Sequence, residues 1–121
     1  MKDESRQALE ALGMDLDQTL QRFVGNEGLL FRFLGRFPSD TTFEQMKAAM
    51  QARNAEDAFH QAHTLKGVVG NLGLGNIFNA VDPMVELLRN GEFEQAESLF
   101  PQLEAAYTQT METLASLNEG A

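Results

Sequence analysis

Two histidines, His60 and His63, lie three residues apart and are the only imidazoles in the chain. Unprotonated imidazole is a good nucleophile at cellular pH and also a common metal ligand. An apolar stripe runs through the same segment at helical spacing, and it consists of Phe59, Ala62, Leu65, Val69 and Leu72. At about 100° per residue, His63 falls roughly 120° from the middle of this stripe. We therefore expect the His63 side chain to point outward.

Two glycines, Gly67 and Gly70, share the predicted helix side of His63, one and two turns further on. Glycine inside a helix costs about 1 kcal/mol relative to alanine, so two on an exposed side need a reason. Either another helix packs closely there, or a bulky partner must reach the histidine. Lys66 lies between this side and the apolar stripe, where its stem can pack and its ammonium group can reach outward. We call Gly67 and Gly70 the glycine strip.

The same segment carries residues of two other site chemistries. Glu56, His60 and His63 share one helix face and could bind Zn²⁺ or iron. A bundled di-iron site repeats Glu-x-x-His on a second helix, and the sequence has no further histidine for it. A dinucleotide loop is excluded, because the pattern that starts at Gly73 has Phe78 where a third glycine is needed.

Apolar residues at three- and four-residue spacing run along the whole chain, and sustained alternation is absent. They predict helices over about 4–12, 15–24, 26–37, 41–50, 54–72, 76–90 and 93–117. Short connections between long amphipathic helices favour antiparallel neighbours. We expect an all-α protein, an antiparallel four-helix bundle over about 41–117 with short additional N-terminal helices over about 4–37. Residues 1–121 then form a single domain.

Local signals mark several helix ends. Asn26 and Asn54 are typical N-cap residues, and Thr41-x-x-Glu44 has the spacing of a capping box. Pro83 and Pro101 fall inside the last two predicted helices, where each should cause a kink or a broken hydrogen bond.

Composition excludes several classes of protein. The chain has 121 residues, no cysteine and a net charge of −9, so disulfides, thiol catalysis and nucleic-acid binding are all disfavoured. Residues 1–53 carry eight acids and seven bases, whereas six acids and no base follow from residue 92 onward. No apolar run is long enough for membrane insertion, and the polar N-terminus is unlike a secretion signal. We expect a cytoplasmic monomer.

The segment His63-Thr64-Leu65-Lys66-Gly67, preceded by Ala62 and followed by Gly70-Asn71-Leu72-Gly73, resembles the signature of histidine-containing phosphotransfer (HPt) domains. The likeness extends to residues 13–37, to 43–67 and to Arg89-Asn90-Gly91-Glu92, and so covers nearly the whole chain.

This resemblance implies that His63 accepts a phosphoryl group and exchanges it with an aspartate of a response-regulator receiver domain. Lys66 would be the phosphate-side cation, Gly67 bare docking surface, and Arg89 a possible second cation. The chain departs from the family's pattern at Asp82-Pro83-Met84-Val85. Many members have an unbroken helix here, and some have a polar side chain near Val85 that orients the imidazole. Val85 cannot make that hydrogen bond.

Partners and cofactors follow from the same resemblance. A hybrid sensor histidine kinase is expected as the other partner, and Mg²⁺ is expected on the receiver, with no cofactor on this chain. The domain would be a phosphocarrier, since nothing in it resembles an ATP site for autokinase activity. The alternative is a helical interaction module that has lost phosphotransfer.

For docking, we expect a receiver to use the glycine strip together with Leu9, Leu12 and Met14 as apolar contacts. Between the two histidines, His63 is favoured because Lys66 lies three residues on, whereas His60 lies nearer Glu56, whose charge repels phosphate.

Overall fold

The computed structural model describes residues 1–119, with side-chain surroundings through residue 117. Every regular element in this range is helical, which confirms the all-α prediction. The elements are α1 (Asp3–Ala11), α2 (Leu16–Arg22), α3 (Glu27–Arg36), the short 3₁₀ helix η1 (Phe37–Ser39), α4 (Thr42–Gln51), α5 (Ala55–Leu72), α6 (Gly75–Arg89) and α7 (Phe93–Glu119).

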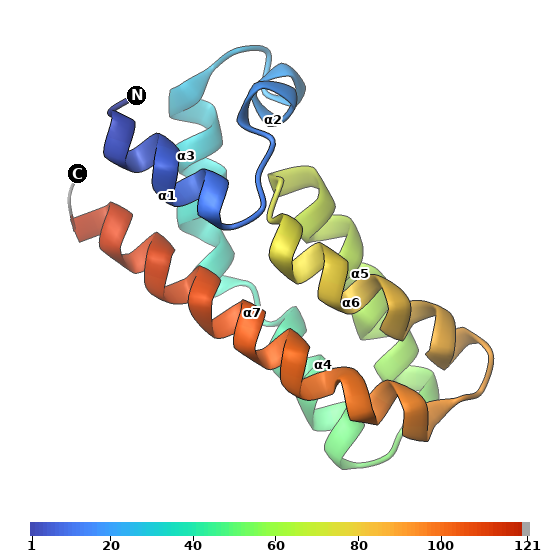
Figure 1. The fold of residues 1–121 in the computed structure, drawn as a ribbon. Coiled ribbons are helices and arrows are strands. Elements are labelled where there is room, and N and C mark those ends of the chain that lie inside the picture. Colours follow the sequence, from blue (N-terminus) through green and yellow to red (C-terminus); the bar gives the residue numbers. More distant parts are fainter. Residues whose placement is uncertain (120–121) are drawn as a thin grey trace.

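Helices α4 to α7 form the predicted four-helix bundle, in which successive helices run side by side in opposite directions (Figure 1). The bundle closes between α4 and α7, where the ring of Phe43 stacks on Tyr107 with centroids 3.9 Å apart. An ion pair between Lys47 Nζ and Glu104 Oε2 joins the same two helices at 2.6 Å. Helices α1 to α3 cover one end of the bundle, in contact with α5 and the C-terminal part of α7.

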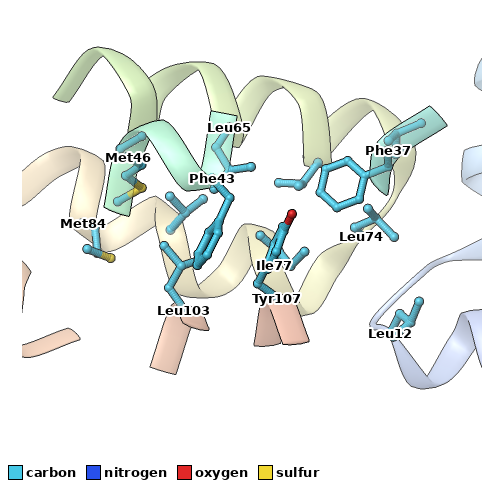
Figure 2. Packing of buried hydrophobic residues seen from close by; sticks show 14 of the residues in the cluster. Leu12, Phe37, Phe43, Met46, Leu65, Leu74, Ile77, Met84, Leu103 and Tyr107 are labelled. Atoms are coloured by element: carbon cyan, nitrogen blue, oxygen red, sulfur yellow. The ribbon is translucent and has the colours of Figure 1, made fainter. Parts of the chain in front are cut away.

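Buried apolar side chains from all four bundle helices meet between them (Figure 2). Phe43 and Met46 come from α4, Leu65 from α5, Met84 from α6 and Leu103 from α7. Removing this apolar surface from water is the main force that holds the helices together. None of the described helices is long and apolar enough to span a membrane.

The capping predictions are confirmed at two of three helices. Asn26 accepts a hydrogen bond from the Leu29 N–H at 3.0 Å, and Asn54 accepts one from the Asp57 N–H at 3.1 Å. The capping box at Thr41 is wrong. Thr41 has ψ near 4°, outside the extended region that an N-cap side chain needs in order to fold back on its helix.

The first turn of α4 is instead held by Asp40. Its Oδ1 accepts a hydrogen bond from the Thr42 N–H at 2.8 Å. Glu44, the other half of the expected box, lies toward α7 with Oε1 3.5 Å from the Tyr107 hydroxyl. The carboxylate of Asp40 is also well placed at the positive end of the α4 dipole.

Neither proline ends its helix, since α6 continues through Pro83 and α7 through Pro101. Proline has no N–H, so the helical bond from each is necessarily missing, as predicted. Both prolines are exposed, and so are Asn79 and Glu97, whose carbonyls lose those bonds. Water can therefore serve as the hydrogen-bond donor to these carbonyls.

A close approach of two glycines attaches the N-terminal helices to the bundle. A Cβ atom on Gly75 would overlap the backbone of Gly13. Next to this contact the Asn76 N–H donates to the Leu12 carbonyl at 2.9 Å, and the Asn76 side chain donates to the Ala11 carbonyl at 3.0 Å. The end of α1 is therefore fixed against the start of α6.

The Tyr107 hydroxyl should lose its proton only at unusually high pH. Burial, and then the nearby charge of Glu44, raise the pKa of Tyr107 to about 12 from an ordinary value of 10.0. The unfolded chain releases this proton near pH 10 and the folded chain only near 12, so stability should fall as pH rises through that window. Because Tyr107 is the only tyrosine and tryptophan is absent, tyrosinate absorbance reports this residue alone. A midpoint near 10 in the folded protein, equal to that in denaturant, would contradict the burial argument.

Candidate functional site

Helix α5 is positioned by one buried face. Its residues Ala58, Ala62, Leu65, Val69 and Leu72 are all buried against the neighbouring helices. Its start is capped by Asn54, and it ends at Gly73, whose φ of 72° is the left-handed conformation that glycine adopts at low cost. With that face buried, the opposite face of α5 points outward, and His63 lies on it as predicted.

The His63 ring packs against an aromatic neighbour on its own helix. Phe59 stacks on it with centroids 5.9 Å apart and an interplanar angle of 23°. No described side chain forms a hydrogen bond with the His63 imidazole. Val85 is fully buried and apolar, so it cannot hydrogen-bond to the imidazole. Phe59 was assigned to the apolar stripe from its spacing, but it is only half-buried, and its contact with His63 was missed.

Lys66 is held beside the histidine by α6. Its Nζ forms an ion pair with Asp82 Oδ1 at 2.7 Å and lies 5.8 Å from the centroid of the Phe78 ring. The side chain is half-buried, as expected for a packed stem with an outward ammonium group. Asp82 is a site residue that sequence reasoning did not assign, because its pairing with Lys66 depends on how α5 and α6 are aligned.

A shallow hollow extends from His63 along the outer face of α5. Its lining is His63, Lys66, Gly67, Gly70, Asn71 and Phe78. The hollow is open to solvent and brings the His63 imidazole, the Lys66 side chain and the glycine strip together at one surface. A protein-sized partner can reach the imidazole there without any rearrangement of the bundle.

The two glycines of the strip have different surroundings. A Cβ on Gly67 would meet nothing within 4 Å, so internal packing does not explain this glycine. A Cβ on Gly70 would lie 3.4 Å from Cε2 of Phe78, an ordinary packing contact with α6. Gly67 therefore supplies the open surface, whereas the space beside Gly70 is already bordered by a ring.

The predicted apolar docking contacts are wrong. Leu9 and Leu12 are 0% exposed and Met14 is 5% exposed, so none of them can contact a partner. Leu12 belongs to the buried core cluster and is among the side chains drawn in Figure 2. The physical reason is the anchoring of the α1 end by Asn76 and the Gly13–Gly75 contact, which turns these side chains inward.

Arg89 and His60 both lie near Phe59. The Arg89 guanidinium carbon is 5.5 Å from the Phe59 centroid, and Arg89 Nη1 is 3.4 Å from Glu86 Oε1. His60 meets the same ring edge-on and is 65% exposed, with Nε2 4.0 Å from Glu56 Oε1. Arg89 thus lies against the ring on which His63 stacks.

The alternative metal site does not form. Among residues that the structure describes, no three carboxylate or imidazole side chains gather in a way that could hold a metal ion. Glu56, His60 and His63 share a helix face, but they do not converge on a common point.

Comparison with known families agrees with this geometry. Residues 38–113 match the model of the Hpt domain, which is more than half of the chain. The chain therefore belongs to the Hpt domain family, and it is a phosphotransfer module of two-component signalling. Domains of this family interact with the receiver domains of response regulators. No curated protein and no solved structure matches the chain significantly.

Gly67 and Gly75 should respond in opposite ways to substitution. Gly67→Gln adds a side chain in open space and removes a helix glycine. The free energy of unfolding should therefore stay the same or rise by up to about 1 kcal/mol, and the thermal midpoint should stay the same or rise with it. Gly75→Ala forces its Cβ into the Gly13 backbone and should lower the midpoint clearly, by the equivalent of about 1–3 kcal/mol. Thermal unfolding followed by circular dichroism measures both. A Gly67→Gln variant that melts as early as Gly75→Ala would assign Gly67 to internal packing.

Proposed function

We propose that His63 is the residue that carries the phosphoryl group, and that it exchanges this group with the phosphorylated aspartate of a receiver domain. The observation that supports this most is the shared hollow, in which an exposed imidazole lies beside Lys66 and the bare helix surface at Gly67. His60 has no such surroundings, because it does not line the hollow and its Nε2 lies 4.0 Å from the carboxylate of Glu56.

The transfer step needs no base from this chain. The unprotonated imidazole nitrogen of His63 attacks phosphorus, an N–P bond forms, and the P–O bond to the aspartate carboxylate breaks. The electron pair of that bond leaves with the carboxylate, and the other ring nitrogen keeps its proton. Phosphoryl transfer of this kind depends mainly on alignment and on neutralising charge. The open surface at Gly67 lets the receiver aspartate align with the imidazole. The Lys66 ammonium group neutralises part of the phosphate charge.

The cation is shared between Asp82 and the incoming phosphate. In the unphosphorylated domain Lys66 is paired with Asp82 at 2.7 Å, which keeps its ammonium group near the hollow. When phosphate arrives, Lys66 can turn part of its hydrogen-bonding capacity to it, since an ammonium group has three donors. Arg89, against Phe59, is a candidate second cation. Mg²⁺ would enter with the receiver.

We further propose that the module works as a monomer in the cytoplasm, between a hybrid sensor histidine kinase and a response regulator. It would carry phosphate without autokinase activity. Docking would centre on Gly67 and the hollow, so the folded Gly67→Gln variant should transfer phosphate more slowly than the wild type. Ala105→Gln, which adds the same side chain at an exposed position of α7, is the matched control.

The two histidines should behave differently in labelling. Incubation with a phosphorylated receiver should label the wild type and His60→Gln to a similar extent, and His63→Gln should not be labelled. The label should be acid-labile, as phosphoramidates are, and peptide mapping should place it on His63. Label on His60 would refute the assignment, and no label on any variant would favour the helical interaction module.

Lys66 and Asp82 should have opposite effects on transfer. Lys66→Ala should slow labelling, because it removes a charge that stabilises the transition state. Asp82→Asn should raise the labelled fraction at equilibrium about two- to fivefold, the scale of an exposed ion pair, since it removes a competitor for Lys66. Glu112→Gln makes the same charge change on α7 and should have no effect. If Asp82→Asn lowers labelling as Lys66→Ala does, Asp82 serves to hold the lysine and does not compete with phosphate.

A further inference from the structure

A second and larger hollow lies between α2, α3 and α5, next to the face that carries His63. Its volume is about 600 Å³, within the range of small-molecule sites. Asn71 borders both this hollow and the one at His63. The walls are mostly apolar, and their large side chains are Phe23, Phe33, Phe37, Val68 and Leu72.

The rim of this hollow exposes aromatic surface. Phe33 is 39% exposed, and its ring packs at 5.5 Å from that of the half-buried Phe23. Phe37 and Leu72 are buried and form the inner wall. Grouped apolar exposure of this kind marks binding surfaces more often than single exposed residues do.

Two guanidinium groups border the same apolar surface. Arg36 lies over the Phe33 ring, with its guanidinium carbon 5.3 Å from the centroid. Arg22 donates to the carbonyls of Gly70 and Asn71 at 3.1 and 3.3 Å, which fixes its position and leaves its charge unpaired. The one acid in the lining, Asp40, is bound to the N-terminus of α4 through its bond from Thr42.

These arginines stand out in an acidic chain. The sequence has 18 acids and 9 Lys and Arg residues, so most cations could find a carboxylate. Yet within the described side chains Arg22, Arg32 and Arg36 form no ion pair, and neither does Lys2 near the N-terminus, whereas Arg6, Lys47, Arg53, Lys66 and Arg89 all do. Three of these four unpaired cations thus lie on α2 and α3, and two of them, Arg22 and Arg36, border the hollow.

We propose that this hollow binds a small amphipathic anion, a molecule with a flat apolar body and one carboxylate or sulfonate group. The apolar body would lie between Phe23 and Phe33 over the inner wall, and the acid group would pair with Arg36. Arg22, which bonds to the last carbonyls of α5, connects the site to the end of the helix that carries His63. The proposal does not depend on phosphotransfer by His63.

The probe 8-anilinonaphthalene-1-sulfonate tests this directly on the purified protein. Its fluorescence should rise to saturation with one site per chain. Arg36→Gln should weaken binding about tenfold, the scale of one charge-assisted hydrogen bond. Arg32→Gln makes the same charge change on the same helix, outside the hollow, and should alter affinity less than about twofold by the same reasoning. Phe33→Ala should nearly abolish binding while circular dichroism remains that of the wild type.

A second measurement keeps the test independent of variant folding. In amide NMR spectra of the wild type, the probe should shift the signals of Phe33, Arg36 and Asn71 most. The uncharged analogue N-phenyl-1-naphthylamine should bind more weakly. Equal weakening by Arg36→Gln and Arg32→Gln, unsaturable binding, or shifts spread over the bundle would overturn the proposal. Perturbation of these amides by a receiver domain without any probe binding would assign the hollow to a protein partner, and would also overturn it.

Discussion

The packing of α5 between α4 and α6 is the constraint on which the site depends. Because the apolar face of α5 is buried on both sides, the helix cannot rotate, and its opposite face must carry whatever residues the sequence places there. His63 and Gly67 are outward for this reason alone. The His63 imidazole is thus exposed because other residues of α5 are buried, and the core and the candidate site have a common physical cause.

The same packing determines how each site residue is supported. Lys66 lies at the boundary between the buried and exposed faces, so its ammonium group reaches Asp82 on α6. Phe59 lies at the corresponding boundary nearer the start of α5, where its ring contacts both His63 and Arg89. Residues at the edge of the buried stripe therefore surround the His63 imidazole, and the Phe59 ring contacts it where Val85 offers no hydrogen bond.

The helices, their antiparallel order and the exposure of His63 could be predicted from sequence, because they follow from local periodicity and capping. The burial of Leu12 and Met14 could not, since it depends on a contact between Gly13 and Gly75 that lie far apart in the chain. The Lys66–Asp82 pair and the arginine-lined hollow likewise arise from the alignment of separate helices. The failure at Thr41 was local: the spacing of a capping box was present, but the backbone at Thr41 turned away from the extended conformation.

The most direct test of the central claim is NMR of the two imidazoles in the wild-type protein during phosphorylation. The chain has only two histidines, so a single nitrogen–proton correlation spectrum follows both at once. After addition of a phosphorylated receiver, the ring signals of His63 should move to positions typical of a phosphoimidazole, while those of His60 change little. A phosphoimidazole signal from His60, with His63 unchanged, would contradict the account.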